Sequence, residues 1–221
     1  MVLAAASSWI SIRTDVYAQS CYSIGALTAG RWKFTPVYVR NNSSAGSSAV
    51  SSARGDWNSL SQPFLVAAYG DFGTSQTDIL IQDAAGNPNY TAQTTDSASG
   101  SCDGWEACSN CYHLSSVLTS STISLNMTAI AQHAVDYTKS QSQVERTVVA
   151  HELGHALALA DSSSNFQCGS GLSIMNPSIG PLLNCNMTGP QTCDATNLQN
   201  LYNGTGGPNS YCFGSCSFGS C

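Results

Sequence analysis

Charged residues are scarce in this chain, and basic residues are the scarcest of them. Lys and Arg together number 7, against 13 Asp and Glu, so the formal net charge of the 221 residues is −6. Proteins bind nucleic acid through clustered basic side chains, and this chain has no such cluster. It also lacks an apolar run approaching the roughly 18 residues that a membrane-spanning helix needs. We therefore expect neither nucleic acid nor a membrane as a partner.

A complete signal peptide is also missing, because residues 1–6 lack both a basic start and a full apolar stretch. No removable pro-segment is recognisable, so we expect a processed chain. Cysteine, by contrast, is abundant, with ten residues between Cys21 and Cys221. A high and even cysteine count is typical of disulfide-bonded proteins outside the cytosol, where reductants do not keep thiols free. We expect a secreted, extracellular protein.

The length and the glycosylation sequences agree with that expectation. A chain of 221 residues suits a single domain that buries its own core. N-x-[ST] sequences, which predict a glycoprotein, begin at Asn41, Asn42, Asn89, Asn126, Asn186 and Asn203.

Hydrophobic periodicity predicts a mixture of strands and helices. Strands are predicted at 32–39, 64–69, 78–82 and 122–127, and helices at 47–60, 144–159 and 194–202. Pro36 is compatible with the first strand only at an edge or a bulge. Residues 1–31 are expected to be irregular or hairpin-like. Residues 83–112 are rich in turn formers and are predicted to form an irregular loop held by disulfides.

The most specific pattern is His151-Glu152-Leu153-Gly154-His155, an H-E-x-x-H motif. Two His side chains four residues apart share one face of a helix and can bind one zinc ion, while Glu152 activates a water molecule as general base. A catalytic zinc usually has three protein ligands and one water. No Glu or His follows His155, so the third ligand is expected to be Asp161 or Asp194. Asp161 reaches the metal only if the helix ends between Leu157 and Asp161, since a continuing helix would point it elsewhere.

Residues 151–161, HELGHALALAD, resemble the extended metzincin motif in the Asp form found in snapalysin-type secreted peptidases. Ile174-Met175-Asn176-Pro177 resembles the Met-turn of that clan. The resemblance covers about residues 32–204, with only these two motifs specific. It implies that His151, His155 and Asp161 bind one catalytic Zn²⁺, that Glu152 is the general base, and that Met175 packs beneath the metal.

The fold that the resemblance implies is α+β, a metzincin-like zincin. A twisted, mostly parallel sheet with two long helices would lie above the cleft, and a small irregular lower subdomain with a C-terminal helix would lie below it. The single catalytic domain, 1–221, would divide into an upper part of about 1–155 and a lower part of about 156–221. Asn176 and Pro177 would form part of the pocket wall for the residue after the cut bond.

Two residues depart from the family pattern. Ala158 occupies the position of a glycine that normally adopts a left-handed conformation, at a cost of roughly 1 kcal/mol or more. This departure keeps Asp194 open as an alternative third ligand. Pro177 occupies the place where some members of the clan have a tyrosine.

The predicted function is a secreted, monomeric zinc endopeptidase that acts on protein or peptide substrates. One alternative is an aspzincin-like protease with Asp194 as the third ligand. Another is a non-catalytic secreted binding protein or effector on a peptidase scaffold.

Other candidate ligands are weaker. Cys108-x-x-Cys111 followed by His113 could be half of a structural zinc site, but no second ligand pair matches it. Calcium could bind oxygen ligands from Asp71, Asp78, Asp83 and Asp103, which follow no recognised loop pattern. His113 and His133 are given no functional role.

Overall fold

The computed structural model describes residues 24–26, 32, 35–60, 65–86, 89–100, 116–162, 168 and 172–203. Two predictions lie outside these residues: the zinc site at Cys108, Cys111 and His113, and a calcium ligand at Asp103.

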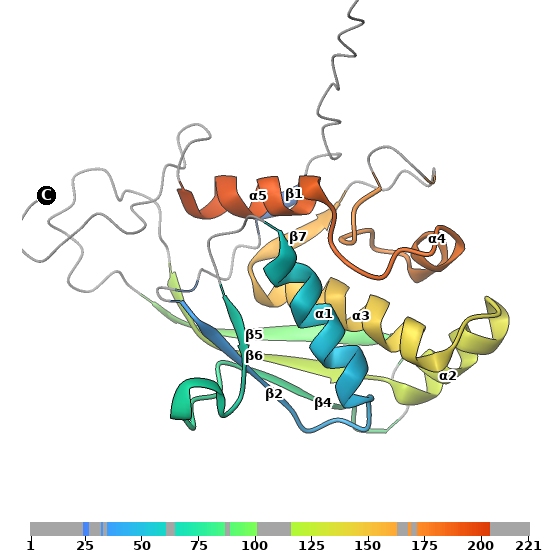
Figure 1. Ribbon diagram of the computed structural model, residues 1–221, viewed down its shortest axis with the longest axis horizontal. Helices are drawn as coiled ribbons and strands as arrows, with labels where there is room; N and C mark the ends of the chain where they lie inside the picture. Colours follow the sequence, from blue (N-terminus) through green and yellow to red (C-terminus); the bar gives the residue numbers. More distant parts are fainter. Residues whose placement is uncertain are drawn as a thin grey trace, which may run out of the picture.

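The described strands form one five-stranded sheet and one small two-stranded sheet (Figure 1). In spatial order, the large sheet contains β3 (Val66–Ala68), β2 (Val37–Asn41), β4 (Ile79–Asp83), β6 (Ser116–Leu125) and β5 (Ala92–Gly100). The first four are parallel, and β5 runs antiparallel to β6 at the edge. The small sheet pairs β1 (Ile24–Ala26) with β7 (Leu159–Ser162). The expected α+β fold with a mostly parallel sheet is confirmed.

Helices cover one face of the large sheet. The described helices are α1 (Ser47–Ser59), α2 (Met127–Asp136), α3 (Gln141–Ala156), α4 (Ile179–Asn184), α5 (Thr192–Asn203) and a short 3₁₀ turn, η1 (Asp71–Gly73). Helices α1 and α3 lie side by side above the sheet (Figure 1). Alternate strand residues, among them Ile79, Ile81, Ile123 and Leu125, are fully buried beneath them. No helix in this part of the chain has the length and apolarity that crossing a membrane requires.

The largest correction concerns residues 83–112, predicted to be an irregular loop. Within them, residues 92–100 form β5, the edge strand next to β6. The sequence AQTTDSASG shows no apolar alternation, because an edge strand needs only one neighbour and its outward side chains meet solvent. The turn-forming residues on either side of β5 led to the prediction of a loop for the whole segment.

Element boundaries also differ from the prediction. The first strand begins at Val37 rather than at residue 32, and it lies between β3 and β4, so the edge position expected for Pro36 is wrong. Pro36 simply precedes the strand. Helix α2 was not predicted, and the strand predicted at 122–127 forms earlier in the chain, as β6. The strand ends at Leu125, and Asn126 caps α2 by accepting a hydrogen bond from the backbone N–H of Ala129 at 3.1 Å.

Candidate metal centre

Helix α3 is fixed to the rest of the upper layer before it reaches the two His residues. Arg146 forms a two-pronged ion pair with Asp56 of α1, with N–O distances of 2.8 and 2.6 Å. The indole N–H of buried Trp57 donates to the carbonyl oxygen of Ala150 at 2.9 Å. These contacts hold α3 against α1 one turn ahead of His151.

The helix ends at Ala156, three residues earlier than predicted. Ala158 has φ of 75°, so it takes the left-handed conformation usual for the glycine of the resembling motif. Two distant side chains bind the free carbonyls at this end: the Trp32 indole N–H donates to Ala156 at 2.7 Å, and the Tyr202 hydroxyl donates to Leu157 at 3.1 Å. The chain then turns into β7, which contains Asp161.

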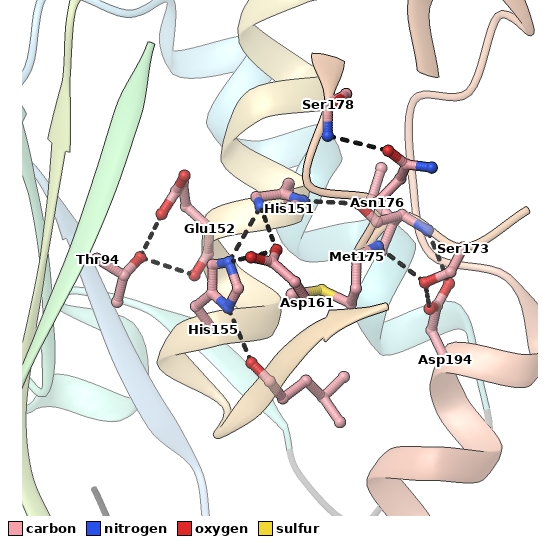
Figure 2. A network of polar contacts seen from close by, with 12 residues as sticks. Thr94, His151, Glu152, His155, Asp161, Ser173, Met175, Asn176, Ser178 and Asp194 are labelled. Atoms are coloured by element: carbon pink, nitrogen blue, oxygen red, sulfur yellow. Dashed lines mark hydrogen bonds and ion pairs between the residues drawn. The ribbon is translucent and has the colours of Figure 1, made fainter. Parts of the chain in front are cut away.

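This turn brings three potential ligand atoms together (Figure 2). The Nε2 atoms of His151 and His155 are 3.0 Å apart, and Asp161 Oδ1 lies 3.6 Å from the first and 3.3 Å from the second. In the described part of the chain, no other group of three His, Cys, Asp or Glu residues gathers in this way. Tetrahedral ligands at zinc bond lengths are separated by about 3.3 Å, so the triangle fits a zinc ion.

The hydrogen bonds on the far side of each imidazole explain its orientation. His151 Nδ1 lies 2.8 Å from the carbonyl oxygen of Ile174, and His155 Nδ1 lies 2.8 Å from that of Leu159. A carbonyl only accepts, so both Nδ1 atoms carry the proton, and in the neutral rings both Nε2 atoms present lone pairs. Two lone pairs at 3.0 Å repel each other unless a cation or a proton lies between them. The donor set therefore has the chemistry of a metal site.

The pKa values of the two imidazoles are shifted in opposite directions. Burial lowers the pKa of His151, which favours the neutral ring. The contact with His155 lowers the pKa of Asp161, which favours the ionised carboxylate. Burial also acts to lower the pKa of His155, but Asp161, Glu152 and the Leu159 carbonyl together raise it. The carboxylates of Asp161 and Glu152 thus favour a positive charge at this position, either a proton on His155 or a metal ion.

Met175 packs against α3 at Gly154, the residue that precedes His155. It is fully buried and lies against Gly154, where an added Cβ would overlap its sulfur atom and come within 3.1 Å of the Trp57 ring.

Asp194, the alternative candidate for the third ligand, is bound by other groups. It is fully buried at the start of α5 and accepts hydrogen bonds from Ser173 Oγ, from the backbone N–H of Ile174 at 3.2 Å and from that of Gln191 at 2.7 Å. Ser173 Oγ in turn accepts from the backbone N–H of Met175 at 2.9 Å. Asp194 does not join the ligand group. It holds the loop whose Ile174 carbonyl orients His151 (Figure 2).

A cleft of about 870 Å³ opens beside the three candidate ligand residues. Its walls include residues 89–94, which lead into and begin β5, and residues 176–182, which include the expected Asn176 and Pro177. Thr94 of β5 donates a hydrogen bond to Glu152 Oε2 at 2.6 Å. Thr94 was not among the candidate site residues, because residues 83–112 were predicted to form an irregular loop.

The remaining candidates have local roles. Nε2 of His133 lies 3.0 Å from Thr91 Oγ1 at the cleft wall. Asp71 accepts from the backbone of Ala68, while Asp78 accepts from Tyr38 and Asp83 from Ser44. These three carboxylates do not come together as a calcium site would require.

Cys168 and Cys185 form a disulfide, which ties the segment before residue 172 to the end of α4. Disulfides of this kind are consistent with an oxidising compartment. Comparison with known protein families and with characterised proteins gives no match for this chain. The case for its function therefore rests on the site itself.

Proposed function

We propose that this chain is a secreted, monomeric zinc endopeptidase of the metzincin type, which hydrolyses peptide bonds in proteins. The observation that carries the proposal is the facing pair of Nε2 atoms 3.0 Å apart, with both Nδ1 atoms against carbonyl oxygens and the Asp161 carboxylate beside both Nε2 atoms. Structural His residues do not normally present lone pairs to one another. Metal ligands do.

His151, His155 and Asp161 would hold the metal ion, and Glu152 would do the proton chemistry. Zinc bound there supplies a Lewis acid that polarises the scissile carbonyl and makes a coordinated water more acidic. Glu152 then takes a proton from the attacking water and gives it to the departing nitrogen. Glu152 lines the cleft and is only 5% exposed as a residue, so bulk water competes little for that proton.

The edge strand β5 supports a peptide as the substrate. Beyond β5 the described sheet has no further strand, so its outer backbone groups are available to pair with an extended chain. Residues 89–94 at its start line the cleft beside His151 and Glu152. A peptide paired there would place a backbone carbonyl near the metal ligands, without any requirement for a particular side chain.

Removal of the metal tests the proposal most directly. We expect the purified protein with one equivalent of zinc to cleave casein, and 1,10-phenanthroline to reduce cleavage to background. The non-chelating isomer 1,7-phenanthroline is the matched control and should have no effect. Added zinc should restore cleavage after the chelator is removed by dialysis. Complete absence of cleavage by the zinc-loaded protein would instead favour a binding protein on a peptidase scaffold.

Zinc affinity distinguishes the two aspartates. Asp161→Asn should weaken zinc binding by more than about 100-fold, since even loss of a group that only orients a ligand costs about 10- to 100-fold. Asp194→Asn should have the smaller effect on zinc affinity but lower the free energy of unfolding by about 1–3 kcal/mol, because buried donors lose their acceptor. Competition with a fluorescent zinc chelator measures the first quantity and urea denaturation the second. A larger loss of zinc affinity in Asp194→Asn would support the aspzincin-like alternative.

Secretion and glycosylation belong to the same proposal. The Cys168–Cys185 disulfide supports an oxidising compartment. Asn126 is buried and caps α2, so it is a poor glycan acceptor, whereas Asn42, Asn89 and Asn186 are exposed. Mass spectrometry of the protein secreted from eukaryotic cells should find glycans at the exposed positions.

A further inference from the structure

Glu152 is held by one side chain of the edge strand. The hydroxyl of Thr94 lies 2.6 Å from Glu152 Oε2 and 3.2 Å from the carbonyl oxygen of the same residue. The hydroxyl has a single proton, and an ionised carboxylate at 2.6 Å is the stronger acceptor. We infer that Thr94 is a positioning residue for Glu152, an inference that rests on the proposed peptidase function. Figure 2 shows this contact extending from the β5 side to α3.

The position of Thr94 on β5 determines which way its hydroxyl points. Thr94 is opposite Ile123 of β6, and residues opposite each other in an antiparallel pair share one face of the sheet. Ile123 is fully buried beneath the helices, so Thr94 also faces α3. Thr95, the next residue, points to the other face and is exposed. The two neighbouring threonines therefore form a natural pair of test and control positions.

The contact gives the two carboxylate oxygens of Glu152 different roles. Oε2 is bonded to Thr94, whereas Oε1 has no hydrogen-bond partner among the described residues. With Oε2 anchored, the side chain loses rotational freedom and Oε1 remains to accept a proton from water. Holding a base within a few tenths of an ångström of its working position matters, because a displacement of about 1 Å can cost about 100-fold in rate.

The same contact links the base to the strand on which we place the substrate. Thr94 projects toward α3, and residues 92–94 at the start of β5 line the cleft. A peptide that pairs with β5 would order the strand and therefore the hydroxyl that holds Glu152. Loss of the hydroxyl should lower turnover more than substrate binding, since the backbone groups of β5 are unchanged.

The test compares Thr94→Val, Thr94→Ser and Thr95→Val. Valine keeps the shape and strand preference of threonine without the hydroxyl, and serine keeps the hydroxyl. In the zinc-loaded protein, Thr94→Val should lower kcat by about 10- to 100-fold, within the range that misplacement of a catalytic group produces, and leave KM within about twofold. Thr94→Ser should recover most of the activity. Thr95→Val should match the wild type.

A second measurement needs neither zinc nor activity. The chain has only three glutamates, Glu106, Glu145 and Glu152, so protein labelled with ¹³C-glutamate gives three side-chain carboxylate resonances. The resonance that is lost in the Glu152→Gln variant is that of Glu152. At fixed pH, Thr94→Val should shift that resonance and Thr94→Ser should restore it. The Glu145 resonance is the internal reference, because Glu145 binds the backbone N–H of Gly46 and the Gln141 amide, remote from β5.

The outcomes separate the two proposals. An unshifted Glu152 resonance in Thr94→Val would overturn the positioning role, as would a shifted resonance with unchanged kcat. A fall in both kcat and the folded fraction that serine does not rescue would also overturn it, since only packing would then be involved. If the zinc-loaded wild type cleaves nothing, the peptidase function fails and the catalytic part of this inference fails with it. The resonance still decides whether Thr94 orients Glu152.

Discussion

Glu152→Gln should reduce kcat for peptide cleavage by about 10²- to 10⁴-fold, the contribution typical of a general base. Glutamine has the size of glutamate and can still accept from Thr94 through its carbonyl oxygen, but it cannot take a proton from water. Zinc binding should remain at one ion per chain, because the three ligand residues are intact. Rates on a fluorogenic peptide and zinc content by atomic absorption measure the two quantities.

Glu145→Gln is the matched control for this variant. Glu145 is on the same helix, is equally buried at 5% exposure, and accepts from the backbone N–H of Gly46 at the start of α1. Its replacement should affect stability and leave turnover close to wild type. If Glu152→Gln kept more than about a tenth of the wild-type rate, proton transfer would have to be assigned to another group.

Gly154→Ala should lower the free energy of unfolding by about 1–3 kcal/mol or more, the range of overpacked cores. The usual effect of this change in a helix is the opposite, a gain of about 1 kcal/mol. Here the new methyl group would overlap the Met175 sulfur and approach the Trp57 ring. Displacement of Met175 would also move the Ile174 carbonyl that orients His151, so zinc affinity should fall in parallel.

Gly55→Ala in α1 provides the control, since a Cβ at that position meets no atom within 4 Å. It should stabilise the protein by about 0.4–1 kcal/mol. A double-mutant cycle with Met175→Ala completes the test: removing the methionine side chain makes room, so Gly154→Ala should cost less in that background. Equal costs in both backgrounds, measured by urea denaturation, would show that the overlap is not the cause.

The parts of the fold that the sequence predicted well are those with a strong local signal. Helix α1 was predicted at 47–60 and forms at 47–59, because Val50 and Trp57 repeat at helical spacing on its buried face. The buried strands β3 and β4 were found as short apolar runs. The edge strand β5 was not, because its pairing comes from β6 and its composition is polar.

The candidate site divides in the same way. The spacing of His151 and His155 is a local property, and the absence of later Glu and His residues left only two aspartates. Which of the two aspartates lies beside the His pair depends on contacts between residues far apart in the sequence. Asp194 is engaged by Ser173, and Trp32 closes the end of α3 from 124 residues away. No local pattern encodes such pairs. The catalytic and metal-binding roles themselves remain predictions.

The left-handed turn at Ala158 has a consequence for the evolution of such sites. Exchange for glycine would relieve about 1–2 kcal/mol of backbone strain, but it would remove a buried methyl group worth about 0.8 kcal/mol and add chain entropy to the unfolded state worth about 0.5–1 kcal/mol. These effects nearly cancel, and one nucleotide separates the codons of the two residues. Alanine and glycine should therefore be nearly equivalent at this position, and a search pattern that demands the glycine would overlook chains with this same turn.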